Sequence, residues 1–329
     1  MPARSSATIR VVSLVPSATE ILCELGGRGL LVGRSHECDH PPGVERLPAV
    51  CAPTMPSVAE GADCRSIDER VRQAMAERLP LYTLDLQMLE SLKPDVILTQ
   101  DLCEVCTIDR ASVAKAASRV GARIIALKAE TIEGVLDDAL LLGREVGLES
   151  QAIATIAAWR ERLFAAQERV DPYADGPNVA FLEWTDPPFV AGHWTVQMIE
   201  RAGGRLPLNP TSPVARAGAA AGPMQAERRA GKGRRLTMDE LVESSPDRLI
   251  IAPCGLTLDQ SMRAWREMSR DLRVWQLECV RAGRVAIVDG NQMFNRPGPR
   301  LIDAFEWLVG WLQGRPEMTP ADFPWALAD

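Results

Sequence analysis

Short apolar runs alternate with amphipathic stretches along the first 130 residues, a pattern typical of βα units. The runs at 11–15, 96–99 and 123–127 predict buried strands, with a shorter strand at 30–32. Apolar spacing between these runs predicts helices over residues 68–78, 85–93 and 111–120. An N-terminal α/β lobe follows from this order.

Helix boundary signals support the same order of elements. Ser17 and Glu20 have the spacing of a capping box, which predicts a helix that runs through Leu25 and ends at Gly26. Pro94, directly before the strand at 96–99, predicts the end of the preceding helix.

The second half of the chain repeats this order, which predicts a second lobe of the same kind. Residues 198–204 repeat the pattern of 21–27, residues 241–251 that of 89–99, and residues 283–289 that of 121–127. Thr237 and Glu240 again have capping-box spacing. The predicted fold class is therefore α/β, with two Rossmann-like lobes.

A long helical segment is predicted between the lobes. Apolar positions from 131 to 170 have helical spacing, and Gly147 predicts a break or kink. We expect an N-terminal lobe over 1–130, a linking helical segment over 131–171 and a C-terminal lobe over 172–329. A ligand is then expected in a cleft between the lobes, at the carboxyl ends of the strands.

Composition limits the classes of partner and location. A net charge of −7 argues against a nucleic-acid partner, and no apolar run reaches the ~18 residues of a membrane span. Residues 1–10 lack the pattern of a secretory signal, which predicts a cytoplasmic location. Residues 215–235, rich in Ala, Gly and Arg, predict a basic mobile loop or a contact for phosphate or an acidic partner.

The loops that follow the predicted strands carry the candidate ligand-binding residues. Aromatic side chains there are suited to stacking on a flat ligand, and imidazole or thiol side chains are suited to holding a metal. From these loops we select His36, Gln100, Cys103, Cys106, Trp184, Phe189, His193 and Trp194.

The eight cysteines allow three interpretations. Cys103 and Cys106 form a C-x-x-C pair that, with Cys38 and Cys254, predicts a zinc or iron–sulfur site. The same pair would also suit a ligand-contacting or redox-sensitive site, and buried inert thiols are the third interpretation.

Enzyme signatures are lacking. The chain has no nucleophile elbow, Walker A loop, H-E-x-x-H or G-x-G-x-x-G motif. A thiol-dependent enzyme with Cys103 as nucleophile ranks last, because no partner histidine and acid can be assigned. We predict that the protein is not an enzyme.

Several motifs together resemble the vitamin B12-binding proteins of ABC importers, in order along nearly the whole chain. They are Ser13–Glu20 (SLVPSATE), Val32-Gly33 with 35–42, Leu92–Ile97 (LKPDVI), Pro187-Pro188-Phe189 with Gly192, and Pro299-Arg300. The resemblance implies the type of periplasmic-binding-protein fold in which a long helix joins two lobes. The chain differs from the family at Gln100, where the family has a stacking tryptophan. It also has the Cys103/Cys106 pair and the basic loop as additions, and its residues 1–10 lack the pattern of a secretory signal.

The resemblance implies a rigid cleft and a tetrapyrrole-like or metal-chelate ligand. Phe189, Asn291 and Arg296 fall at positions that resemble corrinoid contacts, and His36 falls in a loop that supplies an aromatic contact. The leading prediction is a soluble substrate-binding protein that sequesters, delivers or senses cobalamin, with cobalt held by Cys103, Cys106 or His36. A metal or iron–sulfur protein on the same scaffold is the alternative. No permease or other protein partner is assigned.

Overall fold

Two units, each with its own β-sheet, make up the described part of the chain. The computed structural model describes residues 9–54, 62–101, 108–172, 174–213 and 228–328. The N unit comprises residues 1–57, 69–129 and 133–158, and the C unit comprises 58–68, 130–132 and 159–329. The predicted α/β class with two lobes is confirmed.

The N unit has a four-stranded sheet in the order β2-β1-β5-β6, and every neighbouring pair is parallel. The strands are β1 (Val11–Ser13), β2 (Leu31–Gly33), β5 (Val96–Gln100) and β6 (Arg123–Leu127). β1 and the first four residues of β5 are buried. Parallel strands covered on both faces need such continuous apolar runs, which made these strands visible in the sequence.

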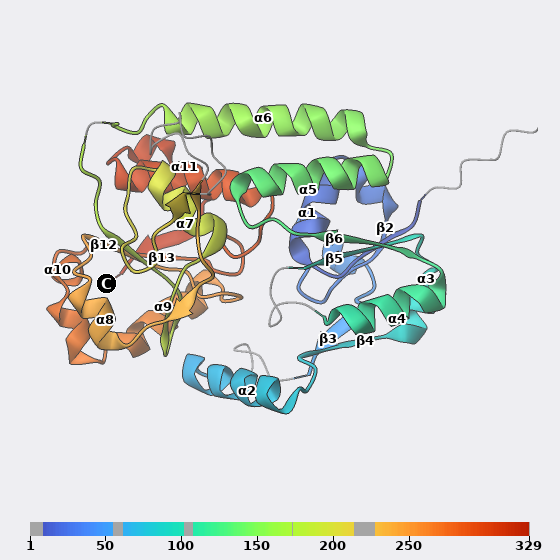
Figure 1. The fold of residues 1–329 in the computed structure, drawn as a ribbon, viewed down its shortest axis with the longest axis horizontal. Helices are drawn as coiled ribbons and strands as arrows, with labels where there is room; N and C mark the ends of the chain where they lie inside the picture. Colours follow the sequence, from blue (N-terminus) through green and yellow to red (C-terminus); the bar gives the residue numbers. More distant parts are fainter. Residues whose placement is uncertain (1–8, 55–61, 102–107, 173, 214–227, 329) are drawn as a thin grey trace, which may run out of the picture. The chain divides into compact units, whose positions relative to one another are not determined.

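Helices cover both faces of the N-unit sheet. Figure 1 shows α1 (Pro16–Glu24) and α5 (Ile132–Glu145) on one side, and α3 (Leu86–Leu92) and α4 (Arg110–Val120) on the other. The side chains of Asp85 and Asp109 accept N–H bonds at the starts of α3 and α4. Two antiparallel strands, β3 (Cys51–Pro53) and β4 (Tyr82–Leu84), form a separate pair, and two short 3-10 turns lie at Gly27–Leu30 and Val44–Arg46.

The helical stretch predicted over 131–170 forms two helices. α5 ends at Glu145, Gly147 has a φ of 77°, and α6 (Glu149–Gln167) follows. The left-handed backbone at Gly147 accounts for the predicted break, since such a φ strains most other residues. The division between the units falls inside α6, after residue 158. A further helix, α2 (Cys64–Glu77), is also divided, after residue 68.

The C unit has a six-stranded sheet in the order β11-β8-β7-β12-β13-β14. β7 (Val179–Thr185), β12 (Arg248–Ile251) and β13 (Val285–Val288) are parallel. β8 (Pro188–Val190), β11 (Arg234–Arg235) and β14 (Trp325–Leu327) pair antiparallel at the margins.

Helices also cover both faces of the C-unit sheet. α7 (His193–Arg201) and α11 (Arg300–Leu312) contact each other on one side, and α8 (Met238–Glu243) and α9 (Leu258–Met268) lie on the other (Figure 1). The C unit also has α10 (Glu278–Arg281) and 3-10 turns at Leu272–Gln276 and Pro316–Met318.

Both sheets have the same parallel core, as the repeated sequence pattern predicts. β1 pairs with β5 at Val11↔Val96, and β7 pairs with β12 at Val179↔Arg248. The margins differ, because β2 is parallel to β1 whereas β8 is antiparallel to β7. A turn at Asp186–Pro187, whose peptide bond is cis, separates β7 from β8.

The capping box predicted at Ser17 is wrong. The N-cap of α1 is Val15, two residues before Ser17, and among the described residues no side chain caps the helix, whose first turn contains Pro16. The Ser17 hydroxyl instead donates to Gln100 Oε1 at 3.4 Å. Proline suits the first turn of a helix because its missing N–H has no partner there anyway.

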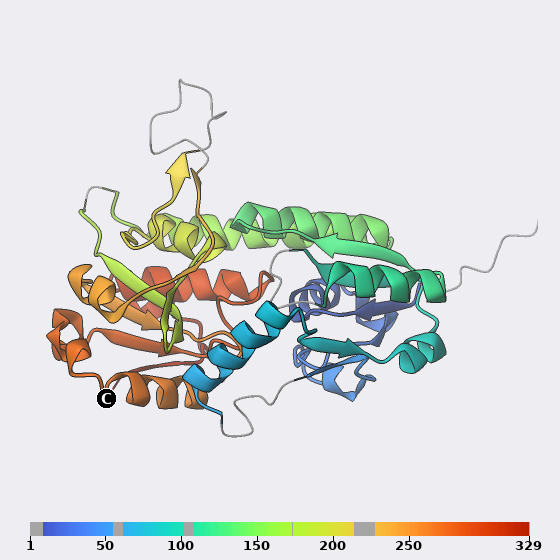
Figure 2. The ribbon, with the colours of Figure 1, turned by 60° about the horizontal axis from the view of Figure 1, so that its bottom comes forward.

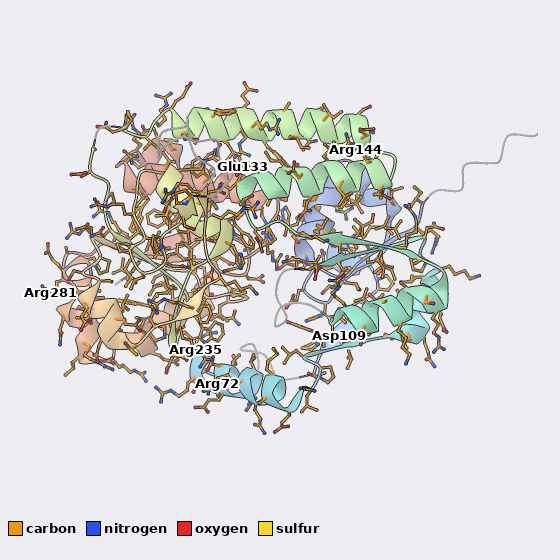
Figure 3. All side chains as sticks on the ribbon, viewed as in Figure 1. Arg72, Asp109, Glu133, Arg144, Arg235 and Arg281 are labelled. Atoms are coloured by element: carbon orange, nitrogen blue, oxygen red, sulfur yellow. The ribbon has the colours of Figure 1, made fainter. Side chains whose placement is uncertain are left out.

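The basic segment is structured where it is described. Residues 215–227 of the predicted loop lie outside the described residues. Arg228–Arg229 form β10, paired with β9 (Ser212–Pro213), and Figure 2 shows this ribbon extending away from the six-stranded sheet. Arg228 Nε lies 3.5 Å from Glu200 Oε2, and Arg235, labelled in Figure 3, pairs with Asp68. Strand pairing and ion pairs therefore order residues 228–235.

Candidate functional site

Three loops of the C unit are hydrogen-bonded together at the carboxyl edge of its sheet. The Cys254 N–H donates to the Glu183 carbonyl at 2.9 Å, which joins the end of β7 to the loop after β12. The Asn291 N–H donates to the Leu256 carbonyl at 2.9 Å, which joins that loop to the one after β13. A Cβ on Gly290 would lie 2.0 Å from the Pro253 carbonyl oxygen, so this approach requires glycine.

Two residues that sequence reasoning missed hold the loop after β13. Asp289, 3% exposed, accepts N–H bonds from Leu258 at 3.1 Å and Gln292 at 2.8 Å. Asn295 Nδ2 donates to the carbonyls of Ala252 at 2.9 Å and Gly290 at 2.8 Å. A polar residue directly after a buried apolar strand was the only signal in the sequence for Asp289.

Asn291 and Arg296, both predicted as ligand contacts, contact each other. Arg296 Nη2 donates to Asn291 Oδ1 at 2.8 Å, and Arg296 is 8% exposed. Arg300, exposed to the same extent, donates to Gln292 Oε1 at 3.0 Å. Arg296 lies in the loop after β13, and Arg300 is the first residue of α11. Both guanidinium groups are positively charged and nearly buried, and burial of a charge costs free energy.

The tryptophans of this edge are engaged inside the C unit. Trp184 Nε1 donates to the Cys64 carbonyl at 3.1 Å, and the ring packs on Cys64, Leu256 and Ala264. Trp194 is 6% exposed and donates to the Phe294 carbonyl at 2.5 Å. Both indoles therefore hold the unit together, and this geometry favours packing over stacking on a ligand.

Phe189 and His193 are only partly buried. Phe189 lies on β8, opposite Trp184 in register and opposite Arg235 on its other side. His193 starts α7 with a φ of 51°, and its ring stacks 5.8 Å from that of Trp194. Burial lowers the pKa of His193, with Glu130 opposing and Lys232 adding to the effect, so the imidazole is neutral at pH 7.

His36, in the N unit, contacts a cysteine that the sequence did not single out. His36 Nδ1 lies 3.4 Å from Cys51 Sγ, and the ring centroid lies 5.7 Å from that of Tyr82. Burial, and then the charge of Arg34, lower the pKa of His36. Its imidazole is therefore also neutral at pH 7, the form in which histidine binds metals.

The remaining candidates include the four predicted metal ligands. Gln100 ends β5 and accepts the Ser17 hydroxyl. Cys38 is 1% exposed, with Sγ 3.0 Å from Thr19 Oγ1, whereas Cys254 is exposed. Cys103 and Cys106 lie outside the described residues. Within the described residues, no three or more His, Cys, Asp and Glu side chains are arranged to hold a metal ion.

Comparisons with known proteins find matches among solved structures. No family model matches the chain, and no curated protein matches it. A periplasmic heme-binding protein from Pseudomonas aeruginosa has a TM-score of 0.68 and 20% identity, over 97% of this chain and 98% of that one.

Two further solved structures match over similar lengths. The periplasmic vitamin B12-binding protein BtuF of Vibrio cholerae has a TM-score of 0.62 and 18% identity, over 94% of this chain and 98% of that one. A possible iron-binding, periplasmic solute-binding protein from Staphylococcus epidermidis has a TM-score of 0.64 and 19% identity, over 92% of this chain and 97% of that one. All three neighbours are described as binding proteins.

The predicted cytoplasmic location is corrected by these comparisons. The three solved proteins are described as periplasmic, which contradicts that prediction. The prediction depended on residues 1–10 alone, and that stretch is no basis for a location. No helix in the described part of the chain is long and apolar enough to cross a membrane. The chain therefore has the two-lobed α/β fold of these periplasmic binding proteins.

Proposed function

We propose that this protein is a solute-binding protein for a metal chelate, with cobalamin or a related corrinoid as the predicted ligand. The observation that carries the proposal is the C-unit edge, where hydrogen-bonded loops hold Asn291 and Arg296 near the carboxyl ends of parallel strands. Ligands of open α/β sheets bind at such edges. Solved proteins of the same fold are described as binding heme, vitamin B12 or iron.

Phe189 is proposed to contact the face of the chelate. Its ring is partly exposed, in contrast to that of Trp194, so it is available to a planar macrocycle. Asn291 and Arg296 would hydrogen-bond the polar substituents of the macrocycle, because an amide offers donor and acceptor groups and a guanidinium offers a fork of donors. His193, neutral at pH 7, would add a further donor or acceptor.

His36 is proposed to ligate the metal of the chelate. A neutral imidazole is a strong ligand for first-row transition metals, including cobalt and iron. The lowered pKa of His36 keeps this form dominant at pH 7 without the need to remove a proton. Cys103 and Cys106 stay predicted ligands, to be tested by substitution.

Titration with hydroxocobalamin, followed by absorbance and calorimetry, tests the proposal. We expect saturable binding, and a loss of affinity of about tenfold in Phe189→Ala, the equivalent of about 1.4 kcal/mol of ring contact. Phe164→Ala is the matched control, since Phe164 is 62% exposed on α6 and should leave binding unchanged.

A parallel titration with hemin decides between chelates. If only hydroxocobalamin binds tightly, the ligand is a corrinoid. If only hemin binds tightly, the ligand is a porphyrin and the corrinoid assignment is wrong. His36→Gln should remove the imidazole-dependent change in the absorbance of the bound chelate, and His40→Gln should keep it. Absence of saturable binding of either chelate to the wild-type protein overturns the proposal.

A further inference from the structure

We propose that Cys51 is a positioning residue, which holds the proton of His36 on Nδ1 and so leaves the lone pair on Nε2 for a metal. The inference rests on the proposed function, in which His36 ligates the metal of a chelate. Cys51 lies on β3, in the antiparallel pair that is separate from the four-stranded sheet.

The hydrogen bonds of Cys51 indicate which atom is the donor in its contact with His36. Cys51 is 6% exposed, and its Sγ donates to Ser35 Oγ at 3.4 Å. A thiol has one hydrogen, so the sulfur can only accept from a second partner. That partner is His36 Nδ1, at 3.4 Å, which must then carry the hydrogen.

The loop around His36 is fixed from several sides. Arg34 donates to the carbonyls of Ser35 at 2.8 Å, His36 at 3.1 Å and Glu45 at 2.8 Å. Tyr82, on β4, packs against the imidazole ring with a 41° tilt. A ring held by its backbone, one face and one nitrogen has little freedom to turn, as a ligand for a metal requires.

Glu37 is the charged group near the other ring nitrogen. Its Oε1 lies 3.9 Å from His36 Nε2, beyond hydrogen-bond distance, and its side chain is 43% exposed. Water therefore screens this carboxylate, whereas Cys51, the partner of the other ring nitrogen, is buried. The contact with Cys51 decides which nitrogen carries the proton, because the partner of one ring nitrogen sets the role of the other.

Nitrogen-15 NMR of the imidazoles in the ligand-free protein tests the inference without any chelate. The chain has three histidines, so His36→Gln identifies the His36 signals. We expect the Nδ1–H form of His36 in the wild-type protein and in Cys51→Ser, whose hydroxyl also accepts. Cys51→Ala should shift His36 toward the Nε2–H form, and Cys23→Ala, a control on α1, should not. An unchanged His36 tautomer in Cys51→Ala overturns the inference.

A hydroxocobalamin titration of the same variants measures the consequence. Loss of a residue that orients a metal ligand typically lowers metal affinity 10- to 100-fold, so Cys51→Ala should bind more weakly by that factor. Cys51→Ser should recover most of the affinity. A wild-type protein that binds no chelate contradicts the proposed function, whereas wild-type binding that Cys51→Ala leaves unchanged contradicts the role of Cys51.

Discussion

Asp138 is a buried carboxyl group whose ionisation opposes folding, and Asp138→Asn is expected to stabilise the protein above pH 6. Asp138 lies on α5 and is 8% exposed. Its Oδ2 accepts the N–H groups of Lys128 and Ala129, each at 2.9 Å. Burial raises the pKa of Asp138 to about 6 and outweighs these two bonds, which lower it. Asparagine keeps a carbonyl oxygen for both N–H groups and cannot ionise.

The sign of the pH dependence follows from the raised pKa. Below about pH 4 both the folded and the unfolded chain hold the proton, so Asp138 contributes no pH dependence. Between about 4 and 6 the unfolded chain has released a proton that the folded chain still binds, so the free energy of unfolding falls as pH rises. The rise of the pKa from 3.8 to about 6 corresponds to about 3 kcal/mol, lost by pH 7.

Urea denaturation followed by circular dichroism, at pH 4 and pH 7, measures this loss. The two proteins should differ little at pH 4, and Asp138→Asn should be more stable by up to about 3 kcal/mol at pH 7. With m values of ~1–3 kcal/mol/M, the urea midpoints should then differ by on the order of 1 M. Glu161→Gln is the control, because Glu161 is exposed on α6 and is not among the groups that shift the pKa of Asp138. A difference between wild type and Asp138→Asn that is the same at both pH values refutes the reasoning.

Three further substitutions test the packing around the candidate site. Gly290→Ala should destabilise the protein by about 1–3 kcal/mol in urea denaturation, because its Cβ meets the Pro253 carbonyl oxygen; an unchanged midpoint would mean that the two loops separate easily. Trp194→Phe should cost about 1–3 kcal/mol in the same assay, since the Phe294 carbonyl loses its donor, and a Trp194→Phe protein as stable as wild type would contradict this bond. Thr237→Ala should cost about 1 kcal/mol of thermal stability through loss of the capping box, whereas Thr237→Ser should cost little.

The sequence was sufficient for elements whose signals are local. The strands at 96–99 and 123–127 were predicted because buried parallel strands are continuous apolar runs, and the structure places β5 and β6 there. The predicted burial is wrong for the start of β6, an edge strand on which Arg123 and Ile124 are exposed. The Thr237 capping box is confirmed, since both of its hydrogen bonds lie within four residues. Ser17 has the same local signal, but its hydroxyl is used by Gln100, 83 residues away, and that contact has no trace in local spacing.

At the candidate site, too, contacts between residues far apart in the sequence were the ones that could not be predicted. Residues after β7 and β12 were selected because parallel strands end at one edge, whereas Asn291 and Arg296, after β13, were selected from the family resemblance. Backbone hydrogen bonds join the end of β7 and both loops in the structure. The contact between His36 and Cys51 was not predicted, because it depends on how the loop after β2 packs on the antiparallel β3–β4 pair. Asp289 and Asn295 were missed for a related reason: they bind backbone groups, which have no sequence signature.

The aromatic residues of the C-unit edge show why side-chain type alone does not identify a ligand contact. Trp184, Phe189 and Trp194 have equal claims by position in the sequence, since all three lie in or next to the loops that follow β7 and β8. Indole carries an N–H that needs an acceptor when the ring packs inside a protein, and both indoles find one inside the unit, although Trp184 is only partly buried. The phenyl ring of Phe189, which is partly buried to a similar degree, has no such requirement. The indole N–H groups are therefore used in hydrogen bonds within the unit, and Phe189 is the aromatic residue that we propose as the ligand contact.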